Sequence, residues 1–365
     1  MYSVCSTSSK TRTTSQTSIF LSPISRNCSG QPSERYNMAP FLSSDDGRSV
    51  ASLRTINFAA LEDGDRSEVD KLLAASVEYG FFYLDFAKST VASLPTGKEK
   101  LFRLMENYFC QPIDAKMLDS QGKPTRGYVS GGTFSAIDRA KPNESFEHLA
   151  IGSYELRQDI SKTLPLQFQK NCSLTSYYIS TCEYIVDVLL HRLSDVLDLK
   201  GDLNLAQDHC HDKPSDTILA LLSYPGQLTH QKHTDLGSLT VLFSDQWGLQ
   251  VIAPQTSQWE WVEPRVNHAV INIGDTLRFL SGKKLYSCVH RVTREGRAGE
   301  EGHRYSIAYL LRPNDTTEFS DADDAHTTAK EFVSTKYSAY CATYAEQEKN
   351  AVLTGGMEQV LGVHG

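Results

Sequence analysis

The chain has 365 residues, of which 40% are hydrophobic and 22% are charged, so it carries enough apolar material to bury a sizeable core. Its net charge of −8 is unlike the basic surface of general nucleic-acid-binding proteins. No apolar run approaches the roughly 18–20 residues needed to span a bilayer. We therefore exclude a histone-like protein, a membrane protein and a wholly disordered protein, and we expect neither nucleic acid nor membrane as a partner.

The eight cysteines are scattered along the chain without a C-x-x-C pair or a dense cluster. This spacing argues against a disulfide scaffold or a zinc ribbon, and it is typical of a reducing compartment in which cysteine acts as a small hydrophobic residue. We expect a cytoplasmic protein. A mitochondrial location is the alternative, and it depends on the nature of the N-terminal segment.

The N-terminal segment, residues 1–46, is rich in Ser and Thr, and within its first 37 residues Glu34 is the single acidic residue. Such a composition buries too little apolar surface to offset its ordering entropy, so we expect disorder. Two interpretations remain open. The segment resembles a transit peptide in composition, although it shows no convincing amphipathic helix. Alternatively, Met38 is the functional start and the preceding residues are dispensable.

Periodic elements follow this segment. Apolar alternation and helical spacing predict, in order, a strand in LRTINFAAL, a helix beginning near Asp65, a buried strand in FFYLDF, an amphipathic helix through Leu101–Phe109, a Gly-rich loop over residues 116–143 and a long helix over residues 166–196. The first part of the chain is therefore predicted to be mainly helical.

After residue 213 the pattern changes to short β-rich runs separated by Gly, Pro, Asp and Asn, such as TILALLSYP, LTVLFSD, AVINIGDTLRFL and RYSIAYLLRP. Strands at this spacing predict a sandwich or barrel of the jelly-roll kind, and hence an α+β chain with a β core. From Thr328 a helical pattern returns, which we expect to pack against the outside of the core. The predicted regions are 1–46 (tail), 50–165 (N-terminal region), 166–212 (long helix and linker), 213–320 (β core) and 321–365 (C-terminal helical segment).

A possible metal site begins at His233-Thr234-Asp235. The pattern H-x-[DE] occurs once, which chance alone would give, so its value comes from its position between two predicted strands. In an extended segment, residues i and i+2 point to the same side, so His233 and Asp235 can reach one metal ion together.

His290 is the leading candidate for a third ligand, because it lies in the β-rich run CVHRVTR between apolar neighbours. Two imidazoles and one carboxylate form the facial triad of non-haem Fe(II) oxygenases. Zinc could use the same ligands, but a zinc hydrolase would also need a general base near the bound water.

Other histidines could compete for this role. His209 and His211 lie in the polar, proline-terminated segment DHCHDKP, which we interpret as a solvated loop. His230 precedes His233 in the same segment but has no carboxylate two residues after it. We expect all three to be surface histidines.

A second set of polar residues is suited to a carboxylate ligand. Arg304 and Ser306 share one side of the strand RYSIAYLLRP, and a guanidinium with a nearby hydroxyl can hold a carboxylate. Tyr224 ends an earlier strand and could donate a hydrogen bond to the same ligand. The alternative is that the arginine makes a surface ion pair and the tyrosine lies at the edge of the core.

Taken together, the segments SYP, HTDLGSLTVLF, GLQV, NIGDTLRFLSGKKLYSCVHRV and RYSIAYLLRP resemble the catalytic domain of Fe(II)- and 2-oxoglutarate-dependent dioxygenases of the isopenicillin N synthase-like family. The resemblance covers roughly residues 50–320. Plant members typically read Asn-His-Gly after GFF, whereas this chain has Leu84-Asp85-Phe86, which favours a fungal-type member. The resemblance implies a double-stranded β-helix core.

Residue by residue, the resemblance implies that His233, Asp235 and His290 bind Fe(II), whereas Arg304 and Ser306, assisted by Tyr224, hold the distal carboxylate of 2-oxoglutarate. It also implies O2 as a cosubstrate, ascorbate as an activator, and no catalytic side chains beyond the metal centre.

The expected function is the oxidation of a small-molecule metabolite by hydroxylation, desaturation or cyclisation. We expect a monomeric enzyme of specialised metabolism. One alternative is an oxidase or cyclase of the isopenicillin N synthase or aminocyclopropane-carboxylate oxidase type, which does not use 2-oxoglutarate. Another is a non-catalytic ligand-binding barrel. We expect the substrate pocket to involve Tyr128–Phe134 and the C-terminal helix.

Overall fold

The computed structural model describes residues 48–133, 146–159, 164–197, 199, 204–225, 230–293, 303–347 and 351–358. All of them belong to one compact unit, Leu42–Gly365. The predicted tail, residues 1–46, and the proposed start at Met38 lie outside the described residues. Within the described part of the chain, no helix combines the length and the apolar character that crossing a membrane requires.

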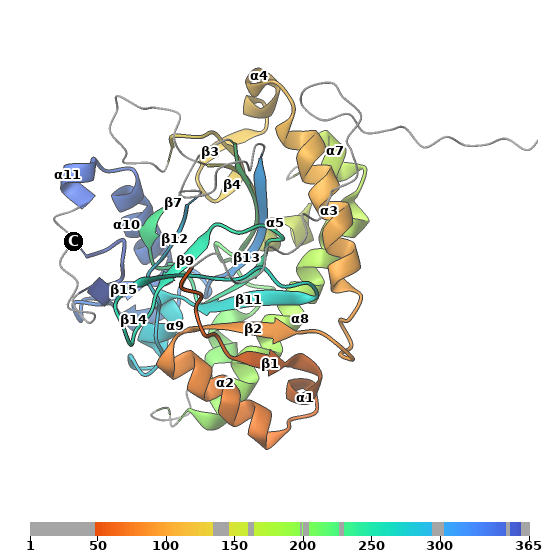
Figure 1. Cartoon of the computed structure of the whole chain (residues 1–365). Helices are drawn as coiled ribbons and strands as arrows, with labels where there is room; N and C mark the ends of the chain where they lie inside the picture. The colour runs from red at the N-terminus through yellow and green to blue at the C-terminus, as the bar shows by residue number, and fades with distance from the viewer. Residues whose placement is uncertain are drawn as a thin grey trace, which may run out of the picture. The chain divides into compact units, whose positions relative to one another are not determined.

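The helices alternate with strands along the chain (Figure 1). They are α1 (Phe58–Glu62), α2 (Arg66–Glu78), α3 (Leu94–Phe109), α4 (Ile113–Met117), α5 (Ser153–Gln158), α7 (Leu166–Gln169), α8 (Cys172–Val196), α9 (Asp275–Leu280), α10 (Ala329–Tyr340) and α11 (Tyr344–Gln347), with a 3-10 helix at Leu205–His209. The predicted helix start at Asp65 is confirmed, because its side chain accepts a hydrogen bond from the Glu68 backbone N–H at 3.0 Å.

The strands form three sheets. They are β1 (Thr55–Asn57), β2 (Phe81–Asp85), β3 (Ser120–Lys123), β4 (Arg126–Val129), β5 (Glu147–Gly152), β6 (Ile218–Tyr224), β7 (His230–His233), β8 (Leu239–Phe243), β9 (Leu249–Ile252), β10 (Trp259–Trp261), β11 (His268–Ile273), β12 (His290–Val292), β13 (Arg304–Leu311), β14 (Glu318–Ser320) and β15 (His326–Thr328). With the helices, these sheets confirm the predicted α+β class.

The large sheet has nine strands in the order β1-β2-β11-β8-β13-β6-β5-β4-β3. All neighbouring pairs are antiparallel except β1 and β2. A smaller four-stranded sheet has the order β10-β9-β12-β7, and β14 and β15 form a hairpin. The strands β1–β5 precede residue 213, so the large sheet also includes strands from outside the predicted β core.

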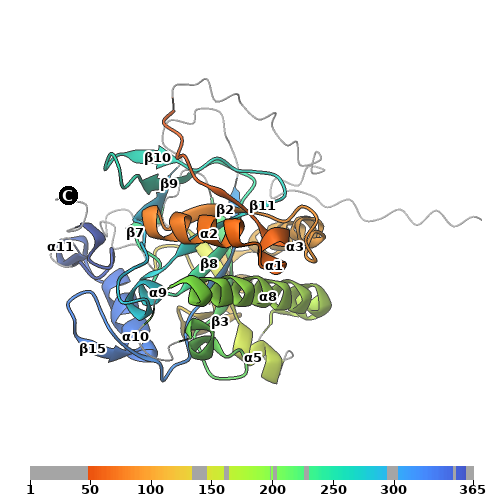
Figure 2. The same ribbon diagram turned by 90° about the horizontal axis from the view of Figure 1, so that it is seen from below.

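The two faces of the large sheet have different partners. On β13, Tyr305, Ile307, Tyr309 and Leu311 belong to the main hydrophobic core, which they share with α2, α3 and α8. Seen from below, α2 and α8 lie across this face (Figure 2). The alternate residues of β13, from Arg304 to Leu310, therefore point to the opposite face, because strand side chains alternate.

That opposite face packs in part against the small sheet. Val251 of β9 and Val292 of β12 share a buried cluster with Phe81 of β2 and Tyr224 of β6. The small sheet, which includes β7 and β12, thus lies over one part of the large sheet.

One prediction about this architecture was wrong. Residues 116–143 were expected to form a loop, but β3 and β4 form an antiparallel pair at the end of the large sheet. The sequence of β3, SQGK, is polar because it is an exposed edge strand, and so it gives no apolar pattern. Residues 134–143 lie outside the described residues. The C-terminal helix α10 packs against α9 and β14, where Phe332 shares a buried cluster with Phe279 and Phe319.

Of the six cysteines among the described residues, five are thiols. Cys172, Cys182, Cys210, Cys288 and Cys341 are free, and Cys182 and Cys288 are buried. Cys110 is disulfide-bonded. Burial raises the pKa of both buried thiols, which keeps them protonated and inert.

Candidate metal centre

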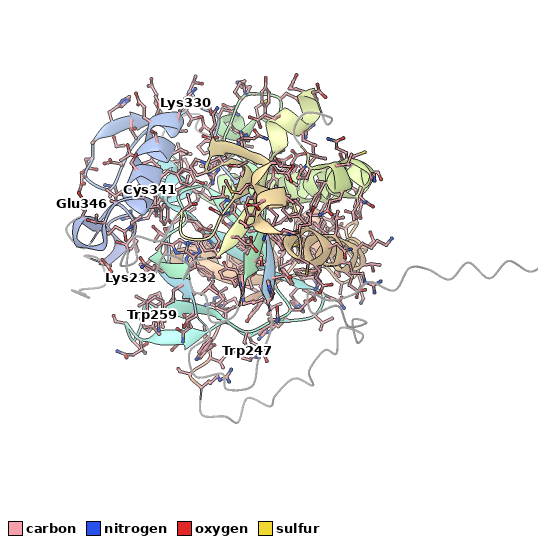
Figure 3. All side chains as sticks on the ribbon, turned by 90° about the horizontal axis from the view of Figure 1, so that it is seen from above. Lys232, Trp247, Trp259, Lys330, Cys341 and Glu346 are labelled. Atoms are coloured by element: carbon pink, nitrogen blue, oxygen red, sulfur yellow. The ribbon has the colours of Figure 1, made fainter. Side chains whose placement is uncertain are left out.

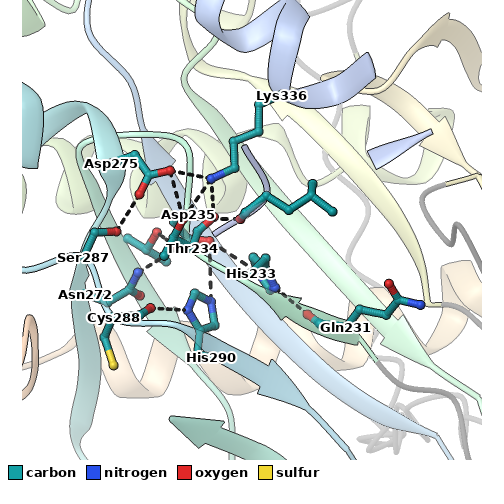
Figure 4. A network of polar contacts seen from close by, with 12 residues as sticks. Gln231, His233, Thr234, Asp235, Asn272, Asp275, Ser287, Cys288, His290 and Lys336 are labelled. Carbon is teal, nitrogen blue, oxygen red and sulfur yellow. Dashed lines mark hydrogen bonds and ion pairs between the residues drawn. The ribbon is translucent and has the colours of Figure 1, made fainter. Parts of the chain in front are cut away.

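The three predicted metal ligands meet at one point between the sheets (Figure 4). His233 ends β7 and Asp235 follows two residues later, while His290 begins β12 directly opposite His233. The Nε2 atom of each imidazole lies 3.6 Å from Oδ1 of Asp235. Ligand atoms from all three side chains lie within 4.8 Å of one another, so one ion could contact all of them.

Backbone carbonyls orient both imidazoles. Nδ1 of His233 lies 2.7 Å from the carbonyl oxygen of Gln231, and Nδ1 of His290 lies 3.1 Å from that of Cys288. A carbonyl only accepts hydrogen bonds, so each Nδ1 carries the proton and donates it. Nε2 is then left with its lone pair directed at the ligand cluster, which is the tautomer that a metal needs.

The large sheet orients the carboxylate. Oδ2 of Asp235 accepts a hydrogen bond from Asn272 Nδ2 at 2.8 Å and another from the Thr240 hydroxyl. Asn272 and Thr240 are paired neighbours on β11 and β8. With Oδ2 engaged by these donors, Oδ1 is the oxygen that faces the two imidazoles.

The protonation states also suit a cation. Burial by itself raises the pKa of Asp235, but the nearby imidazoles of His233 and His290, together with the hydrogen bond from Asn272, outweigh it and hold this pKa well below its usual range. Burial, with the neighbouring His233, lowers the pKa of His290 to about 4. At neutral pH the site therefore presents a carboxylate and a neutral imidazole, the forms that bind metal.

A buried ion pair supports the loop between the ligands. Lys336 of α10 and Asp275 of α9 are both fully buried and form an ion pair. The Lys336 ammonium also donates to the carbonyl of Thr234 at 2.8 Å, and Ser287 donates to Asp275 at 2.8 Å. Thr234 stands between the two ligands His233 and Asp235, so this network fixes the backbone that carries both (Figure 4).

Sequence reasoning missed this network. Asp275 lies within the segment NIGD that carried part of the family resemblance, but a lysine in a C-terminal amphipathic helix is normally interpreted as solvent-exposed. No local pattern pairs Lys336 with a carboxylate 61 residues before it in the chain.

The last described segment, residues 351–358, closes over the same loop. The backbone N–H of Thr234 donates to the carbonyl of Leu353 at 3.0 Å, and Arg278 donates to the carbonyl of Gly355 at 3.2 Å. Lys232, labelled in Figure 3, pairs with Glu358 at 2.6 Å. The C-terminal end of the described chain is therefore part of the support of the metal centre.

The predicted carboxylate-binding residues also lie together. Arg304 is 1% exposed, and its Nη1 donates to the Ser306 hydroxyl at 2.7 Å. Its Nε donates to the carbonyl of Trp247 at 3.0 Å, and its guanidinium carbon lies 5.0 Å from the ring centroid of Tyr224. Tyr224 is directly opposite on β6. The surface ion pair considered as an alternative for Arg304 is therefore wrong.

A neighbouring glycine makes room for this arginine. Gly248 has a φ of +140°, and a Cβ atom there would lie 2.8 Å from Nε of Arg304. Any side chain at this position would be strained and would also displace the guanidinium.

The expectation that the other histidines lie at the surface was wrong in two cases. His209 is 3% exposed, and its ring nitrogens contact the carbonyl of Leu205 and the hydroxyl of Ser238, each at 2.6 Å. The polar segment around it forms a 3-10 helix that turns this ring inward. His230 stacks on His233 with ring centroids 4.0 Å apart. His211 is partly exposed and contacts Asp187 at 2.8 Å, away from the metal centre.

A cavity adjoins the metal centre. Among the described residues it is lined by Phe146, His148, Ile218, Ala220, Leu222, His230, His233, Asp235, Leu236, Gly237, Thr240, Leu310, Leu311, Arg312, Tyr337 and Tyr340. The C-terminal helix α10 contributes Tyr337 and Tyr340 to this cavity, and the assignment of the cavity as the substrate pocket stays a prediction. Tyr128 does not line this cavity, because its hydroxyl is buried against Glu147, and Phe134 lies outside the described residues.

Two imidazoles and one carboxylate, brought together between two β-sheets, have the donor set of the facial-triad class of non-haem iron proteins. A family model described as "2OG-Fe(II) oxygenase superfamily" matches residues 209–313, which include the three candidate ligands together with Arg304 and Ser306. Relatives identify the family over a longer stretch.

A 2-oxoglutarate-dependent dioxygenase of Gibberella zeae is 38% identical over 318 residues, which are 86% of this chain and 95% of that protein. A 2-oxoglutarate-dependent dioxygenase of Amanita muscaria is 44% identical over 205 residues, covering 54% of this chain and 100% of that protein. The chain belongs to the 2OG-Fe(II) oxygenase superfamily and is an oxidoreductase.

A solved structure shares the fold. The full-length Neurospora crassa T7H in complex with alpha-KG superimposes with a TM-score of 0.64 at 23% identity, covering 81% of this chain and 97% of that one. The family implies Fe(II), 2-oxoglutarate and O2 as the cofactor and cosubstrates.

Proposed function

We propose that this protein binds Fe(II) through His233, Asp235 and His290 and couples the oxidative decarboxylation of 2-oxoglutarate to the oxidation of a small organic molecule. The observation that carries the proposal is that three ligand atoms converge on one point. Other groups of the chain hold the side chains of these atoms in their metal-binding forms.

The donor set fits the metal. Two imidazole nitrogens and one carboxylate oxygen suit Fe(II) and leave coordination positions for other ligands. When bound, the iron supplies the activation of O2. The chain contributes the orientation of the ligands, and it excludes water, since His233 and His290 are 4% and 7% exposed.

For 2-oxoglutarate, we propose that Arg304 holds the distal carboxylate with the hydroxyls of Ser306 and Tyr224. Burial raises the pKa of Tyr224 to about 12, so its hydroxyl remains a hydrogen-bond donor. Charge-assisted hydrogen bonds are strong in such a desolvated place. The two sheets would then form the double-stranded β-helix of the isopenicillin N synthase-like family.

The finer parts of the proposal come from the sequence. They are a hydroxylation, desaturation or cyclisation in specialised metabolism, ascorbate as an activator, a monomeric enzyme and a cytoplasmic location. The alternative oxidase that does not use 2-oxoglutarate is not favoured, because the relatives named above are called 2-oxoglutarate-dependent.

Titration of 2-oxoglutarate tests the proposal. The protein is loaded with Fe(II) under nitrogen, and the binding of 2-oxoglutarate is measured by calorimetry for the wild type and for Arg304→Lys. The substitution keeps the charge but removes the planar pair of N–H donors of the guanidinium. We therefore expect the dissociation constant of 2-oxoglutarate to rise roughly tenfold to hundredfold.

Arg291→Lys is the matched control. Arg291 follows His290 in the chain, but its guanidinium lies over the ring of Trp259, 4.2 Å from the centroid, and donates to Gln250. We expect this control to bind 2-oxoglutarate like the wild type. A wild-type protein that binds Fe(II) but not 2-oxoglutarate would overturn the proposal in favour of the alternative oxidase.

A further inference from the structure

The cavity beside the metal centre contains a second buried arginine that the proposed function does not use. Arg312 directly follows β13, is 3% exposed and lines this cavity together with His233 and Asp235. Its Cγ atom lies 3.1 Å from where a Cβ atom would be placed on Gly237, so a glycine two residues after the ligand Asp235 leaves space for this side chain.

The partners of Arg312 are neutral. Nη1 donates to the backbone carbonyl of Asp216, and Nη2 donates to the hydroxyl of Tyr337 at 3.0 Å. Nε is buried without a hydrogen-bond partner in the part of the chain that the structure describes. A guanidinium carries five N–H donors, so these two bonds leave three of them, including Nε–H, for another acceptor.

The charge of Arg312 is also unbalanced. Within the described ranges it forms no ion pair, since the carboxylate of Asp216 instead lies 3.4 Å from Arg126. Arg126, which is similarly buried, has a second carboxylate partner in Glu155 at 2.7 Å. A buried, unpaired charge is costly, and a cavity that places one beside a reactive centre is suited to an anionic ligand.

Arg312 cannot serve the same carboxylate as Arg304. Both positions have the same parity along the strand direction of β13, and they are eight positions apart, which corresponds to about 26 Å in an extended strand. Along β13, the candidate metal ligands lie between these two arginines. Leu310 is paired with Thr240, whose hydroxyl donates a hydrogen bond to Asp235. The two arginines therefore address two different ligands on opposite sides of the centre.

The rest of the cavity lining limits the chemistry of the second ligand. Ile218, Leu222, Leu236 and Leu310 are apolar, and Ala220 is small. Of the residues that line the cavity, Asp235 is the acidic one, and it is a candidate metal ligand. The lining thus offers an anion a partner at Arg312 but offers an ammonium group no separate partner.

We propose that Arg312 binds the carboxylate of the organic substrate, and that this substrate is a small carboxylic acid with an apolar body lying between Arg312 and the metal centre. The proposal rests on the proposed function, because it assigns the substrate class of the same site. Two parallel N–H bonds from Arg312 would fix the acid and so set which carbon faces the metal.

Matched acids and amides test this assignment. The protein is loaded with Mn(II) and saturating 2-oxoglutarate under nitrogen, which prevents turnover. Phenylacetate, 3-phenylpropanoate, hexanoate and octanoate are then titrated by calorimetry, each beside its primary amide. The amide keeps the shape but removes the charge, so we expect an acid to bind roughly tenfold to hundredfold more tightly than its amide.

Two variants separate the arginines. Arg312→Gln should remove the preference for the acid while leaving the affinity for 2-oxoglutarate within about twofold, because distant sites act independently. Arg304→Lys should weaken 2-oxoglutarate and, at saturating 2-oxoglutarate, leave the preference for the acid intact. If Arg312→Gln does not fold, Arg312→Lys replaces it and should retain only part of the preference, because it lacks the fork.

The outcomes are distinct. Equal binding of acid and amide in every pair, including no binding of either, overturns the assignment of Arg312, as does a preference that survives Arg312→Gln. In those cases normal binding of 2-oxoglutarate leaves the proposed function standing. If the wild type does not bind 2-oxoglutarate, the proposed function itself fails.

Discussion

His290 and Asp235 reach the same point from two regions of the molecule that are built differently. His290 lies in β12, which is hydrogen-bonded to β9 on one side and β7 on the other. Asp235 lies beyond the end of β7, where no ladder continues. His290 is therefore positioned by a sheet, whereas Asp235 is positioned by the contacts that hold its loop.

The loop is held by segments distant in the sequence. The backbone N–H of Asp275 donates to the carbonyl of Asp235 at 2.7 Å, and that of Ser238 donates to the carbonyl of Leu311 at 2.8 Å. Thr234 is bound by Lys336 and Leu353. The side of the centre that carries His290 (the sheet side) therefore depends on strand pairing, whereas the side that carries Asp235 (the loop side) depends on polar contacts with distant segments. The two sides should respond differently to mutation.

The largest expected effect removes a ligand on either side. His233→Ala, Asp235→Ala and His290→Ala should each abolish turnover and bind Fe(II) much more weakly, because two ligands are left of three. Fe(II) added under nitrogen should raise the melting temperature of the wild type by mass action but not that of the variants.

His191→Ala, at an exposed position of α8, is the control and should retain the Fe(II)-induced rise. His209→Ala should lower the stability, because it removes a buried ring, but should keep metal binding. Full activity of the His290 variant would show that the sheet side supplies no ligand.

The second expected effect is confined to the loop side. Lys336→Met leaves the carboxylate of Asp275 buried without its cation, which typically costs about 3–5 kcal/mol of unfolding free energy. Urea denaturation measures this loss, and calorimetry should show weaker Fe(II) binding, because Thr234 loses its support.

The double variant Lys336→Met/Asp275→Asn tests the cause. It removes the uncompensated charge while keeping an acceptor for Ser287, so it should recover much of the stability. Lys330→Met, on the same helix but with a side chain that is 73% exposed, is the control. If Lys336→Met were as stable as this control, the ion pair would not support the loop.

The smallest expected effect concerns orientation. Asn272→Ala removes one of two donors that hold Oδ2 of Asp235, and we expect about a tenfold to hundredfold loss of Fe(II) affinity with a smaller loss of stability than in Lys336→Met. Asn107→Ala, at an exposed position of α3, should change neither quantity.

The sheet side sharpens this test. His290 is oriented by the backbone carbonyl of Cys288, which no side-chain substitution removes. Cys288→Ala should therefore leave Fe(II) affinity near that of the wild type. A loss in Cys288→Ala as large as that in Asn272→Ala would mean that the two sides are not held differently.

The sequence predicted the parts of the site that have a local signature. His233 and Asp235 share one side of an extended segment, Arg304 and Ser306 share one side of a strand, and the resemblance to a known family linked these to His290. The amphipathic helices and the α+β class followed from periodicity. Each of these features depends on residues that are close together in the chain.

The supporting residues could not be predicted in this way. Lys336 and Asn272 have no local pattern that assigns a partner, since their contacts are set only when distant segments pack. His209 lies in a polar segment that was predicted to be solvent-exposed, but the 3-10 helix places its ring against Ser238. Arg312, at the end of a strand before a proline, also has the sequence context of a surface residue.

The bond between Thr234 and the carbonyl of Leu353 has a consequence for biosynthesis. These residues are 119 positions apart, and Leu353 belongs to the last segment described. While the ribosome is still adding that segment, both ligands of the loop have already been synthesised, but the contacts that hold them do not yet exist. The loop that carries Asp235 can therefore be held in place only after the segment around Leu353 has been synthesised.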